Sequence, residues 1–143
     1  MSDIHDSIRA VVWRENHLHL LDQRILPQQE CFIEYNDSHE VSLAIRDMVV
    51  RGAPAIGVTA AYAVVLAARN SFSEVGNAWK SALEPALVEL AESRPTAVNL
   101  FWALDHMRQV IDTLADSENP EATLLAEAIA IQQADIQANC AMG

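Results

Sequence analysis

The sequence predicts an α+β fold, in which a small N-terminal antiparallel sheet of about three strands is followed by a bundle of about five helices. Three observations predict it. Up to residue 36 the apolar residues come in short β-rich runs, one of which alternates between polar and apolar. From residue 37 onward they recur every three or four positions, as on one face of a helix. The 143 residues, 51% of them hydrophobic, suit one globular domain with its own core.

The N-terminal part contains three candidate strands. Ile8 to Trp13 is rich in residues that favour strands, and Arg14-Glu15-Asn16 is expected to turn the chain. His17 to Asp22 alternates between polar and apolar residues, which predicts the hairpin partner of the first run. After Pro27 interrupts the pattern, Cys31 to Tyr35 is the third candidate strand. Together they predict an antiparallel sheet with one polar and one apolar face.

Two helices are predicted in the middle of the chain. The first begins at Asp37, which with Glu40 three residues later resembles a capping box. Gly52 is expected to end this helix, and Pro54 suits the first turn of the next, where its missing N–H costs nothing. The apolar stripe of the first helix consists of Val41, Ala44, Ile45 and Met48. The second helix has a face of small residues at Ala60, Ala63, Val64 and Ala67, which permits close helix packing.

Three further helices are predicted towards the C-terminal end. One covers Ser73 to Ala91, with a kink or break at Pro85. Arg94-Pro95-Thr96 opens the next helix, and Pro120 opens the last. The helix after Thr96 carries an apolar stripe at Leu100, Leu104, Met107, Ile111 and Leu114. The pattern shows no internal repeat, no low-complexity linker and no second domain.

Composition excludes several classes of function. With a formal net charge of −11, most of the surface would repel DNA or RNA. The N-terminus carries acids and no apolar signal segment, and Ala53 to Ala68 is interpreted as a buried helix and not as a membrane span. Cys31 and Cys140 form neither a disulfide framework nor a CxxC pair, which favours a reducing, cytoplasmic setting.

Two segments combine an arginine with a predicted helix start. Arg51 stands before Gly52, Ala53 and Pro54, and Arg94 stands before Pro95 and Thr96. A helix N-terminus carries partial positive charge, so a neighbouring cation is unfavourable unless an anion lies between them. Free backbone N–H groups and guanidinium groups together would suit a phosphate. The alternative, which also stays open, is that both arginines pair with surface carboxylates.

Other residue patterns predict no further chemistry. His17 and His19 share one face of a strand but have no third ligand at useful spacing, so no metal site is expected. Asp105 and His106 are neighbours on a helix and point apart. Cys31 is interpreted as an inert buried thiol. The three tryptophans are expected in the core or at an interface: Trp13, Trp79 and Trp102. No complete nucleophile–base or acid–base pair is found.

Three runs closely resemble the methylthioribose-1-phosphate isomerase family. They are Met48 to Tyr62 (MVVRGAPAIGVTAAY), Ser93 to Asp105 (SRPTAVNLFWALD), and Leu21-Asp22-Gln23 with Leu26-Pro27. The resemblance covers essentially the whole chain, and two independent long motifs carry it. The wider superfamily contains ribose-1,5-bisphosphate isomerases and the regulatory subunits of translation initiation factor 2B.

The resemblance implies a role in methionine salvage, and so in methionine and amino-acid biosynthesis. The family converts the aldose 5-methylthioribose 1-phosphate into the ketose 5-methylthioribulose 1-phosphate, with no metal or organic cofactor expected. Carried over singly, Arg51, Gly52 and Ala53 match one substrate-binding segment, and Arg94 matches a second substrate-binding arginine. A sugar phosphate is therefore the expected small-molecule partner, with no nucleic acid and no membrane.

The sequence also departs from the family pattern. The family's catalytic cysteine lies in a later Thr-His-Cys-Asn-type motif and its aspartate further on, whereas this sequence ends at Gly143. The chain is therefore interpreted as a single N-terminal domain, residues 1–143, with the sheet in 1–36 and the bundle in 37–143. It lacks the family's C-terminal Rossmann-like domain, holds no catalytic residue and is expected to be inactive alone.

One expectation concerns association. Apolar faces around Trp102 that the missing domain would cover predict a homo-oligomer, most simply a dimer. Two alternatives to the isomerase domain stay open. One is a non-catalytic regulatory or assembly domain, as in the initiation factor relatives, and the other is a protein similar to ribose-1,5-bisphosphate isomerase.

Overall fold

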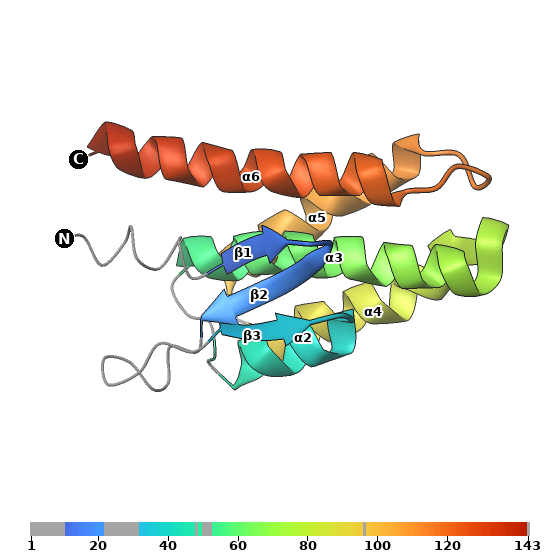
Figure 1. Ribbon diagram of the computed structural model, residues 1–143, viewed down its shortest axis with the longest axis horizontal. Coiled ribbons are helices and arrows are strands. Elements are labelled where there is room, and N and C mark those ends of the chain that lie inside the picture. Colours follow the sequence, from blue (N-terminus) through green and yellow to red (C-terminus); the bar gives the residue numbers. More distant parts are fainter. Residues whose placement is uncertain (1–10, 22–31, 48, 50–52, 96, 143) are drawn as a thin grey trace.

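The computed structural model confirms the predicted order of a three-stranded sheet followed by helices (Figure 1). It describes residues 11–21, 32–47, 49, 53–95 and 97–142, without the side chains of 53, 54 and 135–142. The strands are β1 (Val11–Arg14), β2 (His17–Leu21) and β3 (Phe32–Tyr35). The helices are α2 (Ser38–Arg46), α3 (Ala53–Val75), the 3-10 helix η2 (Gly76–Ala78), α4 (Trp79–Ser93), α5 (Val98–Thr113) and α6 (Glu121–Met142).

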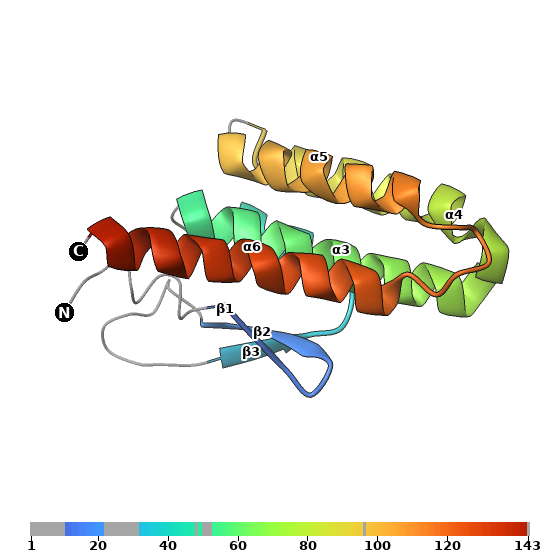
Figure 2. The ribbon, with the colours of Figure 1, turned by 90° about the horizontal axis from the view of Figure 1, so that it is seen from above.

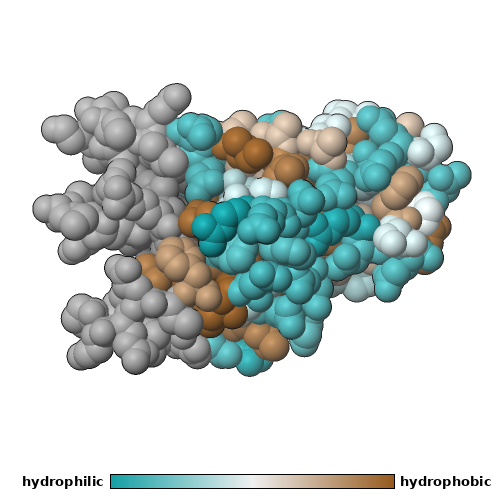
Figure 3. Space-filling model, in the orientation of Figure 1, coloured by the Kyte–Doolittle hydropathy of each residue, from teal (hydrophilic) through white to brown (hydrophobic). Residues whose placement is uncertain are grey.

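The sheet is an antiparallel meander in the order β1-β2-β3. Glu15 and Asn16 connect β1 to β2 with φ angles of 56° and 66°, so both central residues of the hairpin turn lie in the left-handed region. Leu18 and Leu20 of β2 are fully buried, whereas His19 between them is partly exposed. This alternation confirms the two-faced sheet, and Figure 3 shows hydrophilic residues gathered on the middle of its outer face.

Helix α3 is the centre of the fold. Figures 1 and 2 show it between the sheet on one side and the helices α4 and α5 on the other, with α6 alongside. Its residues from Ala60 to Ala68 are all buried, because neighbours cover the helix on every side. The stretch from Ala55 to Ser93 contains a window that is long and apolar enough to cross a membrane, but 83% of that window is buried inside the fold. This burial is typical of a core helix.

A polar and aromatic cluster joins the sheet to α3 and α6. The rings of Trp13 and Tyr62 stack with centroids 5.4 Å apart and planes 11° apart. The Tyr62 hydroxyl donates to Gln132 Oε1 over 2.6 Å, and Gln132 Nε2 donates to the Val11 carbonyl over 2.8 Å. Burial raises the pKa of Tyr62 to about 12, because the interior disfavours the phenolate. These contacts fix β1, α3 and α6 relative to one another, although the three elements lie far apart in the sequence.

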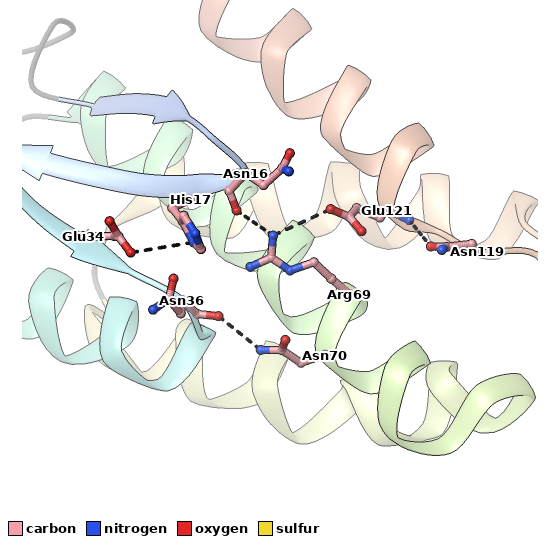
Figure 4. Close-up of polar contacts among 8 residues, drawn as sticks. All are labelled: Asn16, His17, Glu34, Asn36, Arg69, Asn70, Asn119 and Glu121. Atoms are coloured by element: carbon pink, nitrogen blue, oxygen red, sulfur yellow. Dashed lines mark hydrogen bonds and ion pairs between the residues drawn. The ribbon is translucent and has the colours of Figure 1, made fainter.

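Arg69 of α3 makes a second link between these segments (Figure 4). Its Nη1 atom donates to the Asn16 carbonyl in the hairpin turn over 2.6 Å and lies 3.7 Å from Glu121 at the start of α6. The neighbouring Asn70 donates to the Asn36 carbonyl over 3.2 Å. These bonds satisfy backbone carbonyls where the chain leaves the strands, so they orient the sheet on α3.

The helix boundaries correct two predictions. The helix predicted for Ser73 to Ala91 is wrong at its start, because α3 continues to Val75 and Gly76 then breaks it with a φ of +59°. Glycine adopts this left-handed conformation without steric cost, which makes it a common helix terminator. Pro85 lies inside α4 and does not break it. Pro54, in contrast, is the second residue of α3, as predicted.

One of the two hydrogen bonds of the predicted capping box is confirmed. Asp37 is the N-cap of α2, and its Oδ1 accepts a hydrogen bond from the Glu40 N–H over 2.8 Å. Val41, Ala44 and Ile45 face the core as expected, whereas Met48 and Gly52 lie outside the described residues. The stripe from Leu100 to Leu114 is buried, so the predicted packing face of α5 is also confirmed.

One surface pair that joins α2 to α4 is expected to respond to pH. His39 Nδ1 lies 2.5 Å from Glu89 Oε2, and this hydrogen bond raises the pKa of His39 above 6.5. A raised histidine pKa means that the pair stabilises the fold below pH 6.5 and loses this effect as pH rises through the folded-state pKa.

We expect Glu89→Gln to lower the pKa of His39 in an NMR titration. Glu92→Gln, an exposed change on the same helix, is the control, and an unchanged His39 pKa in Glu89→Gln would contradict the assignment.

Candidate functional site

The two segments that sequence analysis singled out meet at one end of the molecule. Helices α3 and α5 both begin there, and α4 ends there, as Figure 2 shows. The motif around Gly57 and the motif around Asn99 are separated by about forty residues of chain, so only the antiparallel path of α4 brings them together. Any ligand held by both motifs would bind at this end.

Gly57 is where helix α3 lies close against the first turn of α5. A Cβ atom at this position would lie 3.2 Å from the Asn99 carbonyl oxygen and 3.5 Å from the Asn99 Cβ. The first distance is closer than ordinary van der Waals contact, so the missing side chain is what allows the first turn of α5 to lie against α3. Asn99 itself is exposed.

We expect Gly57→Val to lower the free energy of unfolding by about 1–3 kcal/mol, because the added branched side chain overpacks the α3–α5 contact. Denaturation in urea measures this change. Ala82→Val, at an exposed position inside α4, is the matched control for placing valine in a helix. If Gly57→Val were as stable as the unmodified chain, the close approach would not constrain the site.

Arg94 lies at the same end, but not where the pattern predicted. It is the C-cap of α4, and α5 begins only at Val98 after the N-cap Ala97, whose N–H donates to the Arg94 carbonyl over 2.9 Å. The hypothesis that Arg94 opens a helix is therefore wrong. A cation at a helix C-terminus interacts favourably with the helix dipole, so its position alone does not require an anion.

The side chain of Arg94 carries a different signal. The residue is half-buried, and its Nη1 atom is buried without a hydrogen-bond partner among the residues that the structure describes. Buried guanidinium N–H groups are nearly always bonded, because leaving one unpaired costs about 1–3 kcal/mol. An acceptor supplied by a ligand would remove that cost. Thr59 Oγ1 in α3 is also buried without a partner in the described part of the chain.

The structure describes the remaining predicted site residues only in part. Arg51 and Gly52 lie outside the described residues. Ala53 is the first residue of α3, with its backbone described and its side chain not. The backbone N–H groups of the first helical turn have no partner inside a helix, so this turn has the character of an anion-binding N-terminus. The contribution of Arg51 stays a prediction.

Elsewhere, the structure pairs groups that the sequence left separate. His106 Nε2 lies 2.7 Å from Glu127 Oε1, which joins α5 to α6, and the His106 ring stacks on Trp102. The sequence could not show this pair, because its members lie on different helices. Among the described residues, no group of three or more histidine, cysteine, aspartate or glutamate side chains could hold a metal ion.

Comparison with known families places the chain. Residues 49–143 match the model of the initiation factor 2 subunit family. The chain belongs to this family. The match covers both motifs and every helix from α3 onward, so it includes the end of the molecule where Gly57 meets Asn99.

Within the family, curated relatives at high identity are methylthioribose-1-phosphate isomerases. The isomerase of Azotobacter vinelandii is 53% identical over 137 residues, which are 96% of this chain and 38% of the relative. That of Nitrosococcus oceani is 53% identical over 143 residues, which are 100% of this chain and 41% of the relative. The chain thus spans about two fifths of the length of these relatives.

Two solved structures share the fold of this family member. The 5-methylthioribose 1-phosphate isomerase of Pyrococcus horikoshii OT3 superposes with a TM-score of 0.74 at 29% identity, over 94% of this chain and 39% of that one. The translation initiation factor eIF-2B, subunit delta, of A. fulgidus superposes with a TM-score of 0.81 at 33% identity, over 89% and 37%. One fold thus occurs in an isomerase and in a translation factor.

Proposed function

We propose that this chain is the N-terminal domain of an aldose–ketose isomerase that converts 5-methylthioribose 1-phosphate into 5-methylthioribulose 1-phosphate in methionine salvage. The observation that carries the proposal is the identity of 53% to named isomerases over the whole chain, against 33% to the translation factor. Residues 1–143 form one domain in this proposal, with the sheet in 1–36 and the bundle in 37–143. A cytoplasmic location and the absence of a cofactor belong to the same proposal.

The proposed role of this domain is to hold the phosphate of the substrate. Arg51 and Arg94 supply guanidinium groups, and Gly52 and Ala53 supply backbone N–H groups at the start of α3. The unpartnered Nη1 of Arg94, and the N-terminus of α3 at the same end of the molecule, support this arrangement. Guanidinium and backbone N–H donors together would bind the phosphate in one orientation, which would position the sugar carbons for proton transfer.

The domain is proposed to lack the groups that move protons. Isomerisation of an aldose needs an acid and a base placed around C1 and C2 of the sugar. Among the described residues, the histidine–carboxylate pairs join α2 to α4, α5 to α6 and β2 to β3, and none of them includes a residue of α3. The part of the relatives beyond this chain would therefore supply the acid and the base.

A chimera tests the proposal. The chain replaces the matching 137 residues of the A. vinelandii isomerase, and turnover of 5-methylthioribose 1-phosphate is measured for the chimera and for the chain alone. We expect turnover from the chimera and none from the chain. A folded chimera without turnover would contradict the proposal, as would turnover by the purified chain alone.

A non-catalytic role in assembly is the second candidate, and the TM-score of 0.81 to the translation factor subunit favours it. Binding separates the two functions. A regulatory domain would leave the chimera folded but unable to bind the sugar phosphate in calorimetry, whereas an isomerase domain would bind it. A ribose-1,5-bisphosphate isomerase would bind ribose 1,5-bisphosphate in preference to 5-methylthioribose 1-phosphate.

The expected dimer stays a prediction, and sedimentation velocity across the micromolar range tests it.

A further inference from the structure

Asn99 lies in the first turn of α5, where asparagine side chains commonly hydrogen-bond the backbone. The N-cap of α5 is Ala97, which makes no side-chain hydrogen bond. Asn99 is exposed, and its carboxamide has no hydrogen-bond partner among the residues that the structure describes. A carboxamide has two N–H donors and one acceptor oxygen. The polar groups of Asn99 are therefore accessible to a ligand.

The contact with Gly57 fixes where this side chain begins. The Cβ of Asn99 is 3.5 Å from the position that a Cβ of Gly57 would occupy. Gly57 and Ala53 are four residues apart on α3, so they lie on the same face of that helix, one turn or about 6 Å apart. The side chain of Asn99 thus begins about one helical turn from Ala53, whose backbone N–H is proposed to bind the phosphate.

The direction of α5 turns this side chain toward the start of α3. Figure 2 shows that α3 and α5 begin at the same end of the molecule and run side by side in the same direction. In an α-helix each Cα–Cβ bond is tilted toward the N-terminus of the helix. For Asn99, that tilt leads from the level of Gly57 toward the level of Ala53. The carboxamide is therefore directed to the α5 side of the proposed phosphate position.

The chemistry of the proposed substrate indicates what the carboxamide meets there. In an aldose 1-phosphate, the hydroxyl nearest to the phosphate is the one at C2, on the carbon next to the phosphorylated carbon. A hydroxyl both donates and accepts hydrogen bonds, and so does a carboxamide. We propose that Asn99 hydrogen-bonds the C2 hydroxyl of the sugar phosphate and makes the site specific for sugars that carry this hydroxyl. The inference rests on the proposed function, which supplies the phosphate position.

Ligands that differ only at C2 test this inference. Ribose 1-phosphate, 2-deoxyribose 1-phosphate and inorganic phosphate are titrated in calorimetry into the A. vinelandii chimera and into its Asn99→Ala variant. We expect the unmodified chimera to bind ribose 1-phosphate roughly tenfold more tightly than the deoxy sugar, near the upper end for one hydrogen bond between neutral groups. In Asn99→Ala this preference should fall below about twofold, while the affinities for the deoxy sugar and for inorganic phosphate change by less than about twofold.

Asn77→Ala is the matched control, because Asn77 is an exposed asparagine in η2, at the opposite end of α3. This variant should keep the preference of the unmodified chimera. A preference that persists in Asn99→Ala would overturn the inference. An equal loss of affinity for all three ligands would also overturn it, because such a loss means that Asn99 supports the site as a whole and does not recognise a hydroxyl.

NMR on the chain by itself gives a second readout, which also decides the question if the chimera does not fold. The side-chain amide signals of Asn99 should shift more with ribose 1-phosphate than with 2-deoxyribose 1-phosphate at equal saturation, because only the first ligand carries the C2 hydroxyl. Equal shifts with the two sugars would contradict the assignment of Asn99.

Turnover separates this inference from the proposed function. A chimera that turns over 5-methylthioribose 1-phosphate, but whose Asn99→Ala variant keeps the C2 preference, would overturn only this inference. A chimera without turnover whose Asn99→Ala variant loses the C2 preference would refute the isomerase proposal and support the assignment of Asn99.

Discussion

Arg94→Ala in the chimera is expected to reduce kcat/KM for 5-methylthioribose 1-phosphate by between about tenfold and 150-fold, mainly through a higher KM. A hydrogen bond to a charged group contributes about 1.5–3 kcal/mol, which corresponds to that range. Arg94 Nη1 is buried and has no hydrogen-bond partner among the described residues. In the proposed function it donates to the substrate phosphate, and this substitution removes that donor. Steady-state kinetics at several substrate concentrations separate KM from kcat.

Two further variants define what Arg94 contributes. Arg94→Lys keeps the charge at the end of α4 but loses the planar fork, so it should restore only part of the lost affinity. Arg46→Ala is the matched control, because Arg46 is an exposed arginine in the last turn of α2, where it pairs with Asp47. Unchanged kinetics in Arg94→Ala, or an equal loss in Arg46→Ala, would refute the role of Arg94 as a phosphate ligand.

Trp79→Ala is expected to lower the free energy of unfolding of the chain by about 3–5 kcal/mol, as is usual for truncating a large aromatic residue in a core. Trp79 is fully buried at the start of α4, and its Nε1–H donates to the Asp116 carbonyl over 3.1 Å. The substitution therefore leaves both a cavity and an unpaired carbonyl in the connection between α5 and α6. Urea denaturation followed by circular dichroism measures the change.

Trp102→Ala is the matched control for this substitution. It removes the same side chain from a 56% exposed position, where the loss is limited to the stacking on His106. We expect it to cost at most about 1 kcal/mol. If Trp79→Ala and Trp102→Ala lowered the free energy of unfolding equally, burial would not determine how much each tryptophan stabilises the fold.

Local signals predicted most of the fold. The alternation of His17 to Leu21, the cap at Asp37 and the stripe from Leu100 to Leu114 are patterns of neighbouring residues, and each was confirmed. The prediction is wrong at one helix boundary. The sequence predicts one helix from Ser73 to Ala91 with a kink or break at Pro85, although Gly76 also lies inside that range. In the fold, glycine ends α3 because it adopts a positive φ, whereas Pro85 is tolerated inside α4.

The candidate site was predictable only in part. A glycine-containing run before a long apolar helix marked the start of α3, and the arginine of the second motif marked the end of α4. The electrostatic argument placed Arg94 at a helix start, because sequence patterns locate helix ends only to within a few residues. The sequence allows Trp102 in the core or at an interface, and its exposure of 56% excludes the core.

The sequence by itself determined the class of fold and the family, because these depend on the order of residues along short segments. The residues at which it predicts a phosphate site stay a prediction. Only the tertiary structure decided that Gly57 lies against Asn99, that Arg94 caps α4 with an unpartnered Nη1, and that α5 presents an ordered tryptophan to solvent. These features depend on how α4 returns the chain along α3, and packing between distant segments leaves no periodic signal in the sequence.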